Sequence, residues 1–232
     1  MLAAVSRFWN FGKLEMLDAV VFDMDGLLID SQPFWQTAQL EVLTALGVPI
    51  TRQDTIDTTG MHIDQIVQMC YAKFPWTEIS CEQVCEQIVD RVIELVREHK
   101  PAMPGLWHAI QVCQQQGLRL GLASSSPLSL IHATVQTLQL EDIFDAQLSG
   151  DKLRYAKPHP EVYLNACEAL QAPPEKCLAI EDSFVGLLAA KSAQMKTSII
   201  PELAVAAQPQ FVIADRQLAS LEQLTPQLLQ TL

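Results

Sequence analysis

Long apolar segments are missing from this sequence. Although 49% of the residues are hydrophobic, no run reaches the roughly 20 apolar residues that a helix needs to cross a bilayer. Residues 1–15 contain Arg7 and Lys13, and they lack the uninterrupted apolar stretch and the small-residue cleavage site of a signal peptide. We therefore expect a cytoplasmic protein, in which residues 1–15 form an N-terminal extension.

Paired cysteine motifs are also missing. The six cysteines include no pair of CxxC motifs, and Cys81 and Cys85, which lie one helical turn apart, are typical of neighbours on a helix. A chain of 232 residues buries enough core to fold without disulfides. The cysteines therefore predict reduced thiols and neither a zinc site nor a disulfide scaffold.

Basic residues are scarce. Lysine and arginine number 15 against 27 aspartates and glutamates, which gives a formal net charge of -12. This charge disfavours nonspecific binding to nucleic acids and to anionic membranes, because both are polyanions. A small anionic ligand remains compatible with it, provided that the positive charge which holds the ligand is local. The sequence contains no feature that requires a partner subunit, and we expect a monomer.

The order of apolar segments predicts an α/β fold with a helical insertion. The run Ala19-Val20-Val21-Phe22 is typical of a strand buried on both faces of a parallel sheet. The chain from 31 to 100 then has apolar residues at helical spacing. The helices predicted in this stretch are Pro33–Leu46, His62–Lys73 and Cys81–His99.

Strands and helices alternate after Pro101. The predicted strands are Leu118–Ala123, Cys177–Ile180, Thr197–Ile200 and, last, Phe211–Ala214. The predicted helices are Leu106–Gln116, Leu128–Leu138, Glu161–Leu170 and Val185–Ala193. This alternation is typical of a doubly wound parallel sheet. We expect a catalytic core formed by residues 16–30 and 101–232, and an α-helical cap formed by residues 31–100.

Several polar residues lie at the carboxyl ends of the predicted strands or in the loops that follow. They are Asp23-x-Asp25, Ser124, Lys157 and Glu181-Asp182. Each has an ordinary alternative, because aspartates favour turns, carboxylates favour helix N-termini and lysines favour the surface. In an open α/β sheet, however, ligands bind outside the carboxyl ends of the strands, so these residues are expected to converge.

Such a group of residues suits phosphoryl transfer. Asp23, Glu181 and Asp182 offer the oxygen ligands that Mg²⁺ prefers, and Lys157 adds a positive charge for phosphate. Ser124 and the backbone N–H groups that follow it, beginning with Ser125, are placed to bind phosphate oxygens at a helix N-terminus. Asp23 could attack phosphorus, while Asp25 protonates the leaving oxygen and later activates water.

Four segments resemble the haloacid dehalogenase superfamily, in particular its phosphatases with a helical cap. They are Phe22-Asp23-Met24-Asp25-Gly26-Leu27-Leu28-Ile29-Asp30-Ser31, Leu122-Ala123-Ser124-Ser125-Ser126-Pro127, Lys157-Pro158-His159-Pro160 and Ile180-Glu181-Asp182-Ser183-Phe184-Val185-Gly186. The resemblance extends from Met16 to the end, and it looks closest to bacterial hexitol-phosphate and 2-deoxyglucose-6-phosphate phosphatases. It implies a Rossmann-like core, Mg²⁺ as the cofactor and a small phosphorylated metabolite as the substrate.

The resemblance also implies a role for each matching residue. Asp23 is the nucleophile and a metal ligand, and Asp25 is the general acid/base that lends its backbone carbonyl to the metal. Ser124, Ser125 and Lys157 bind phosphate, and Glu181 and Asp182 bind the metal. One departure is Ala193-Gln194-Met195, where the family usually has a glycine at the middle position, which would serve as a helix C-cap.

Other activities within the superfamily remain alternatives. The dehalogenases lack the second aspartate, so Asp25 favours phosphoryl transfer. The β-phosphoglucomutase-like enzymes share the core motifs, but they place a histidine where this chain has Trp35 and an arginine near the position of Ile63. Both differences favour a phosphatase. A phosphatase for phosphoglycolate or for a nucleotide is a further alternative.

The cap is expected to select the substrate. A lid that excludes water can enclose only a small leaving group. We expect a hexose or hexitol 6-phosphate. Trp35 and Trp76 either belong to the core of the cap or offer aromatic surfaces to the sugar. Thr58, Thr59 and His62 are then polar partners for its hydroxyls, whereas His159 is expected to fix its own loop.

Overall fold

Six short strands form one parallel sheet in the computed structural model, which describes residues 16–232. They are β1 (Ala19–Phe22), β2 (Arg119–Ser124), β3 (Ala146–Ser149), β4 (Cys177–Glu181), β5 (Lys196–Ile199) and β6 (Arg216–Gln217). Their order across the sheet is β3-β2-β1-β4-β5-β6. β1 therefore lies between β2 and β4, and all pairs are parallel. This confirms the predicted α/β fold.

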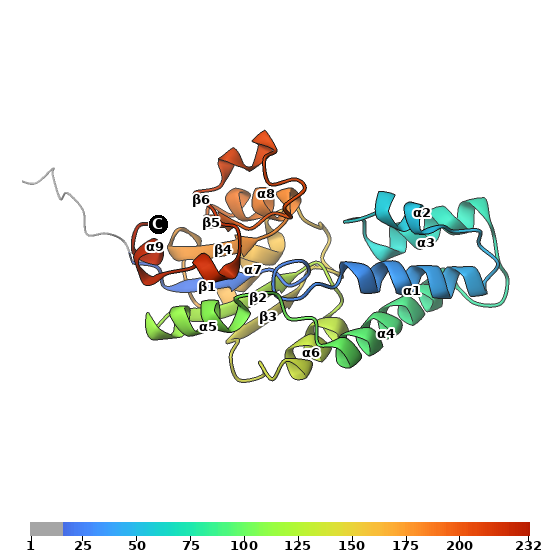
Figure 1. Cartoon of the computed structure of the whole chain (residues 1–232), viewed down its shortest axis with the longest axis horizontal. Coiled ribbons are helices and arrows are strands. Elements are labelled where there is room, and N and C mark those ends of the chain that lie inside the picture. Colours follow the sequence, from blue (N-terminus) through green and yellow to red (C-terminus); the bar gives the residue numbers. More distant parts are fainter. Residues whose placement is uncertain (1–15) are drawn as a thin grey trace, which may run out of the picture.

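Helices surround the sheet and form a separate group at one end of it (Figure 1). The α-helices in residues 16–232 are α1 (Gln32–Ala45), α2 (Arg52–Asp57), α3 (Ile63–Lys73), α4 (Cys81–His99), α5 (Leu106–Gln115), α6 (Leu128–Thr137), α7 (Glu161–Ala169), α8 (Phe184–Ser192) and α9 (Pro226–Gln230). Within this described part of the chain, none is both long enough and apolar enough to cross a membrane.

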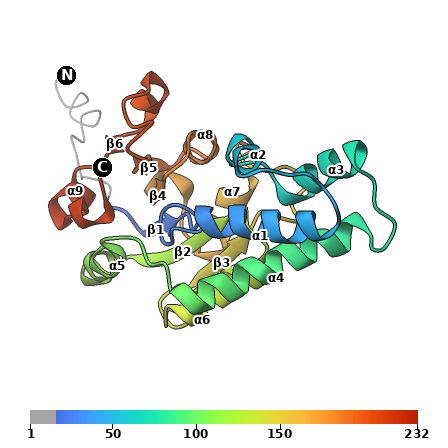
Figure 2. The same ribbon diagram turned by 45° about the vertical axis from the view of Figure 1, so that its right-hand side comes forward.

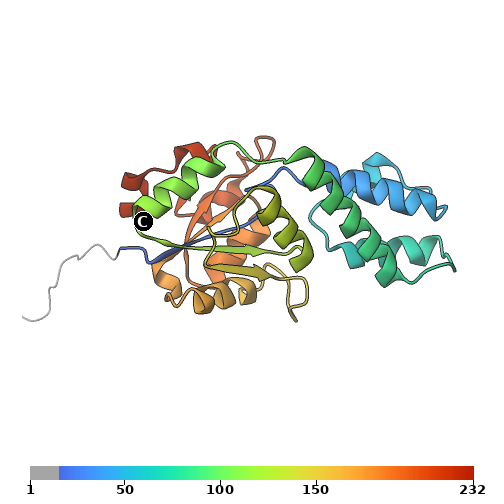
Figure 3. The ribbon, with the colours of Figure 1, turned by 90° about the horizontal axis from the view of Figure 1, so that it is seen from below.

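The side chains of β1 alternate between two apolar layers, as the period of a strand requires. Val20 and Phe22 face a large cluster that includes residues of α5 and α6, such as Leu106 and Leu130. Ala19 and Val21 face a second cluster, which is built from residues of α7 and α8. Helices thus cover both faces of the sheet (Figure 3), and this explains why β1 is apolar at every position.

The helices α1 to α4 lie together beyond the carboxyl ends of the strands (Figure 2). α1 packs against α2 and α4, α3 packs against α4, and α4 also packs against α6 of the core. Ser80 starts α4 with a capping box, in which its hydroxyl accepts from the Gln83 N–H and the Gln83 side chain accepts from the Ser80 N–H. The predicted core and cap boundaries, 16–30, 31–100 and 101–232, stay predictions, and the predicted extension 1–15 lies outside the described residues.

Three elements differ from the sequence prediction. The predicted strand Phe211–Ala214 is wrong, because Pro209 starts a 3₁₀ turn over Pro209–Ile213 and the last strand is Arg216–Gln217 instead. Strand β3 was not predicted, because its edge position leaves Gln147, Leu148 and Ser149 only half-buried, without the apolar run of a central strand. Helix α2 was not predicted, because its six residues have too few apolar positions to show a period.

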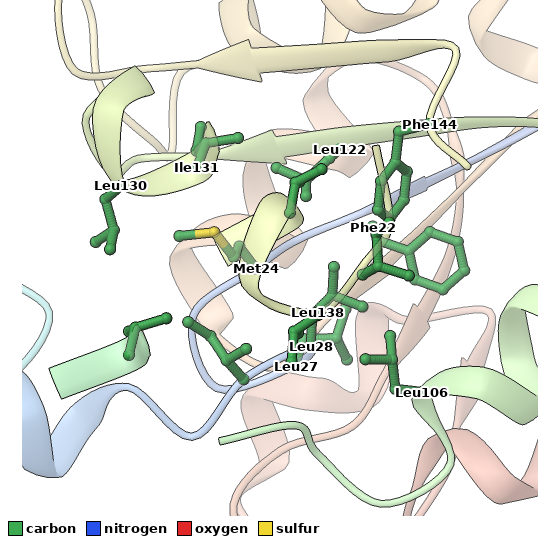
Figure 4. Close-up of a cluster of buried hydrophobic side chains, with 14 of the residues drawn as sticks. Phe22, Met24, Leu27, Leu28, Leu106, Leu122, Leu130, Ile131, Leu138 and Phe144 are labelled. Carbon is green, nitrogen blue, oxygen red and sulfur yellow. The ribbon is translucent and has the colours of Figure 1, made fainter. Parts of the chain in front are cut away.

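A tight turn after β1 fixes the direction of the residues that follow the strand. The Met24 carbonyl accepts hydrogen bonds from the N–H groups of Leu28 and Ile29 at 2.9 and 3.1 Å. Met24, Leu27 and Leu28 are fully buried, and their side chains pack into the apolar cluster around Phe22 (Figure 4). Met24 lies between Asp23 and Asp25 in the sequence and is held in the apolar cluster. The carboxylates of both aspartates therefore lie outside this cluster.

The end of α8 confirms the reasoning about the missing glycine. Gln194 has φ +66°, in the left-handed region that favours glycine. Its N–H donates to the Lys191 carbonyl at 3.0 Å, and the next N–H, that of Met195, donates to the Ala190 carbonyl at 3.1 Å. Gln194 thus occupies a glycine-type C-cap position at the surface.

We expect Gln194→Gly to stabilise the protein by about 0.5–1 kcal/mol, because relief of left-handed strain exceeds the entropy lost by the more flexible unfolded chain. Thermal unfolding should show a Tm about 2–3 °C higher. Gln136→Gly, on the exposed face of α6, is the control, and it should lower stability by about 1 kcal/mol. A lower Tm for Gln194→Gly would contradict the interpretation.

Candidate active site

The predicted site residues converge at the carboxyl edge of the three central strands. Asp23 follows β1, Ser124 ends β2 and Glu181 ends β4, and these strands are neighbours in the sheet. Lys157 reaches the same place from the segment before α7, and its Nζ lies 2.6 Å from Asp23 Oδ1 and 2.7 Å from Glu181 Oε1. Sheet topology therefore joins residues that are up to 158 positions apart (181 minus 23).

Lys157 is a buried cation with a complete set of partners. Its side chain is only 6% exposed, and Nζ donates to the Ala123 carbonyl at 3.1 Å as well as to the two carboxylates. Burial alone would lower the pKa of Lys157, but the carboxylates of Asp23 and Glu181 outweigh it and hold the pKa above its ordinary value. Lys157 is therefore charged at neutral pH.

One lysine does not balance the carboxylates around it. Oxygen atoms of Asp23, Glu181 and Asp182 lie within 4.8 Å of one another. Burial raises the pKa of Asp23 to about 8, although Lys157 opposes the rise. Burial and the charges of Asp23 and Glu181 also raise the pKa of Asp182 well above its ordinary value. In the absence of a further cation, this cluster favours uptake of protons.

A divalent cation fits the same cluster chemically, because three carboxylates form a hard oxygen donor set. The three carboxylates differ in how many of their oxygens already accept hydrogen bonds. Glu181 Oε1 accepts from Lys157 and from the Tyr163 hydroxyl at 2.5 Å, while Oε2 accepts from the Ser183 hydroxyl at 3.0 Å. In the described residues, Asp23 Oδ2 and the Asp182 carboxylate accept no side-chain hydrogen bond of this kind, so they are the most available to a metal.

Two glycines leave room for the carboxylates of this cluster. At Gly26, where φ is +84°, an added Cβ would lie 2.1 Å from Asp182 Oδ2. At Gly186, a Cβ would lie 1.9 Å from Glu181 Oε1. Any side chain at either position would therefore displace a carboxylate of the cluster.

Four donors surround the Asp25 carboxylate. Ser31 Oγ and Trp35 Nε1 donate to Oδ1 at 2.6 and 3.3 Å, and the hydroxyls of Ser124 and Ser126 donate to Oδ2 at 3.0 and 2.7 Å. Sequence reasoning gave no such role to Ser31, Trp35 or Ser126. Ser31 and Ser126 do lie within the recognised motifs, which is the signal that could have found them.

A cavity of about 190 Å³ lies between these residues and the cap helices. Its volume is several times the roughly 30 Å³ of one water in the liquid. Residues of the core that line it include Asp25, Ser125, Ser126 and Lys157. Residues of the cap that line it include Trp35, Gln39, Thr55, Thr58, Thr59, His62 and Ile66.

For Trp76, the structure supports a place in the core of the cap and not a surface that faces the sugar. Trp76 is only 5% exposed, its Nε1 donates to the Ile79 carbonyl at 3.0 Å, and its ring packs edge-on against Tyr71. It belongs to the core of the cap and does not line the cavity. His159 behaves as expected of a residue that fixes its loop, because its Nδ1 accepts from the Glu161 N–H at 3.3 Å and its ring lies on Tyr155.

Comparisons with known proteins agree with this geometry. The family model for haloacid dehalogenase-like hydrolases matches residues 17–194. Hexitol phosphatase B of Escherichia coli K12 is 45% identical over 208 residues, which cover 89% of this chain and 94% of that protein. The phosphorylated carbohydrates phosphatase of Thermotoga maritima is 31% identical, over 76% of this chain and 82% of that protein. The crystal structure of CbbY from Rhodobacter sphaeroides in complex with phosphate superposes with a TM-score of 0.84 at 27% identity, covering 94% and 100% of the two chains.

We expect Mg²⁺ to stabilise the folded protein, because a cation bound only to the folded state shifts the unfolding equilibrium. The gain is about 2.7 kcal/mol at a hundredfold excess over Kd. Thermal unfolding in EDTA and in increasing Mg²⁺ would measure it. Asp182→Asn should abolish the Mg²⁺-dependent rise in Tm. The control is Asp215→Asn, which alters a carboxylate paired with Lys191 and should keep that rise. A Tm independent of Mg²⁺ would contradict the metal site.

Proposed function

The chain belongs to the haloacid dehalogenase-like hydrolases and is a phosphatase, and we propose that its substrate is a small sugar phosphate: a hexose or hexitol 6-phosphate, or a close analogue such as 2-deoxyglucose 6-phosphate. The observation that carries this proposal is the bounded cavity, which joins Asp25 and Lys157 to the polar and aromatic residues of the cap. The names of two relatives, a hexitol phosphatase and a phosphorylated carbohydrates phosphatase, support the same substrate class.

Asp23 is the proposed nucleophile. A carboxylate oxygen of Asp23 attacks phosphorus, the bond from phosphorus to the sugar oxygen breaks, and an aspartyl-phosphate forms. Water then attacks phosphorus, the bond to Asp23 breaks, and phosphate leaves. When bound, Mg²⁺ supplies positive charge to the phosphate, and Asp23, the Asp25 backbone carbonyl, Glu181 and Asp182 are its proposed ligands.

Asp25 is the proposed general acid and base. In the first step its carboxyl proton goes to the leaving sugar oxygen, and in the second its carboxylate accepts a proton from the attacking water. Its position supports this role, because Asp25 lines the cavity where the leaving group would lie. The four donors around its carboxylate hold it in place before the substrate enters.

Lys157, Ser124 and Ser125 are the proposed phosphate-binding residues. Lys157 lines the cavity and lies 2.6 Å from Asp23, so its charge is next to the attacking oxygen. The Ser124 hydroxyl donates to Asp25 at 3.0 Å. In the proposed complex, an oxygen of the bound phosphate is an alternative acceptor for the same hydroxyl. Ser125 lines the cavity on the side that leads to α6.

The lining of the cavity favours hydrolysis over mutase chemistry. A mutase must hold a second phosphate in the cap, and no arginine occurs among the cavity-lining residues in the described part of the chain. Ile63 lines the cavity at the position where an arginine was considered, and Trp35 uses its indole N–H on Asp25. A monomeric state, a cytoplasmic location and the absence of nucleic-acid partners stay predictions.

Substrate choice can be tested by measuring phosphate release and sugar-phosphate isomerisation side by side. We expect hexose and hexitol 6-phosphates to give the highest kcat/KM in a panel that includes phosphoglycolate and nucleoside monophosphates, because the cavity is small and polar on the cap side. Isomerised product in excess of free phosphate would establish the mutase instead. A nucleotide or phosphoglycolate as the best substrate would overturn the proposed sugar specificity.

We expect Asp23→Asn to lower kcat by at least about 10³-fold, because an amide is a poor nucleophile and the covalent step cannot begin. Steady-state phosphate release from p-nitrophenyl phosphate measures this, with the Tm as a check on folding. Asp215→Asn, which removes a carboxylate outside the site, is the matched control and should keep kcat within a factor of two. Retention of a tenth of the wild-type kcat by Asp23→Asn would rule out its role as the nucleophile.

A further inference from the structure

Gln39 has an unsatisfied polar atom in an otherwise well-paired site. It lies on α1, one helical turn after Trp35, and both residues line the cavity. The residue is only 5% exposed, yet its Oε1 finds no hydrogen-bond partner among residues 16–232. A buried amide oxygen without a partner costs roughly 1–3 kcal/mol, so this position is not explained by stability.

The surroundings of Gln39 distinguish it from other unsatisfied atoms. The described residues contain three more buried side-chain oxygens without partners, those of Thr134, Gln147 and Ser198, and none of these residues lines the cavity. Gln39 alone in this set lines the space between the cap and Asp25, although its Oε1 is itself shielded from solvent. The same space is bordered by the polar cap residues Thr55, Thr59 and His62 as well as by apolar ones, so hydrogen-bonding groups lie within reach of a ligand there.

We propose that Gln39 determines specificity by accepting a hydrogen bond from a hydroxyl of the leaving group. This inference rests on the proposed sugar-phosphate activity and assigns a residue to it. An aliphatic hydroxyl suits the site because it both donates and accepts. Oε1 is shielded from solvent in the free protein, so the proposal includes a half-turn of the amide that exchanges Oε1 with the NH₂ group when the substrate binds. A substrate hydroxyl therefore satisfies the atom that the free protein leaves unpaired, and an alkyl chain does not.

The physical consequence is a difference between matched substrates. An alkyl phosphate that lacks hydroxyls must leave the Gln39 carbonyl buried and unpaired, whereas a hexitol phosphate pairs it. Trp35, one turn earlier, offers an aromatic face to the carbon chain of either substrate and does not discriminate between them. Gln39 therefore acts in selection of the leaving group, and the chemistry at Asp23 is independent of it.

The test is the ratio of kcat/KM for sorbitol 6-phosphate to that for n-hexyl phosphate, which has the same chain length without hydroxyls. Gln39→Met has about the same side-chain volume as the wild type but no amide. We expect it to lower this ratio about tenfold, which corresponds to the loss of roughly one hydrogen bond. The loss should fall on sorbitol 6-phosphate, whereas activity on hexyl phosphate should not decrease. Gln39→Leu repeats the test with a second apolar side chain.

Stability supplies an independent readout. Gln39→Met should raise the Tm by about 2–4 °C, because it removes an unsatisfied polar atom. Thr134→Val is the control, since it removes another unsatisfied oxygen, in α6 and away from the cavity, and should leave the substrate ratio unchanged. An unchanged ratio in both Gln39 variants, or an equal loss on the two substrates, would overturn the proposed role of Gln39. The proposed substrate class would not be affected by that result. A wild-type enzyme that prefers hexyl phosphate would overturn the proposed substrate class together with this inference.

Discussion

The ion pairs of one buried lysine hold together the edge of the sheet that carries the candidate active site. Lys157 joins Asp23, after β1, to Glu181, at the end of β4, and the two distances are 2.6 and 2.7 Å. Burying such charges is costly unless each finds partners, and here the Tyr163 hydroxyl and the Ser183 hydroxyl complete the shell of Glu181. Even so, the carboxylates exceed the lysine in charge, and this excess favours either uptake of protons or binding of a further cation.

The fold provides the position that this charge cluster needs. Because β1 is central, residues after it are flanked by the ends of both β2 and β4. Apolar residues on both faces of β1, together with the buried Met24, fix the strand and its turn in the core. Gly26 and Gly186 then let the acidic residues approach without a side chain between them. The apolar residues around β1 thus hold the charged residues in position at the carboxyl ends of the strands.

The sequence predicted the features that depend on local pattern and on motifs. Apolar runs revealed the central strands, helical spacing revealed α4 to its last residue, and the spacing of Asp23 and Asp25 after a strand indicated the catalytic edge. It did not predict β3 or α2, whose short segments draw their stability from neighbours. Nor could it decide between the two interpretations of Trp76 or show that Gln39 is unpaired, because both depend on how separate helices pack.

The hydrogen bonds of Asp25 connect the cap to the chemistry. Two donors come from the core: Ser124 is the last residue of β2, and Ser126 lies in the loop between β2 and α6. Trp35 comes from α1 of the cap. Any movement of α1 relative to the sheet therefore changes the shell of Asp25 on one side and leaves it intact on the other. The cavity lies at this same junction, so a leaving group that contacts the cap also contacts the residues that orient the proposed acid. The proposed substrate selection and the proposed proton transfer thus depend on one helix face, on which Trp35 and Gln39 lie a single turn apart.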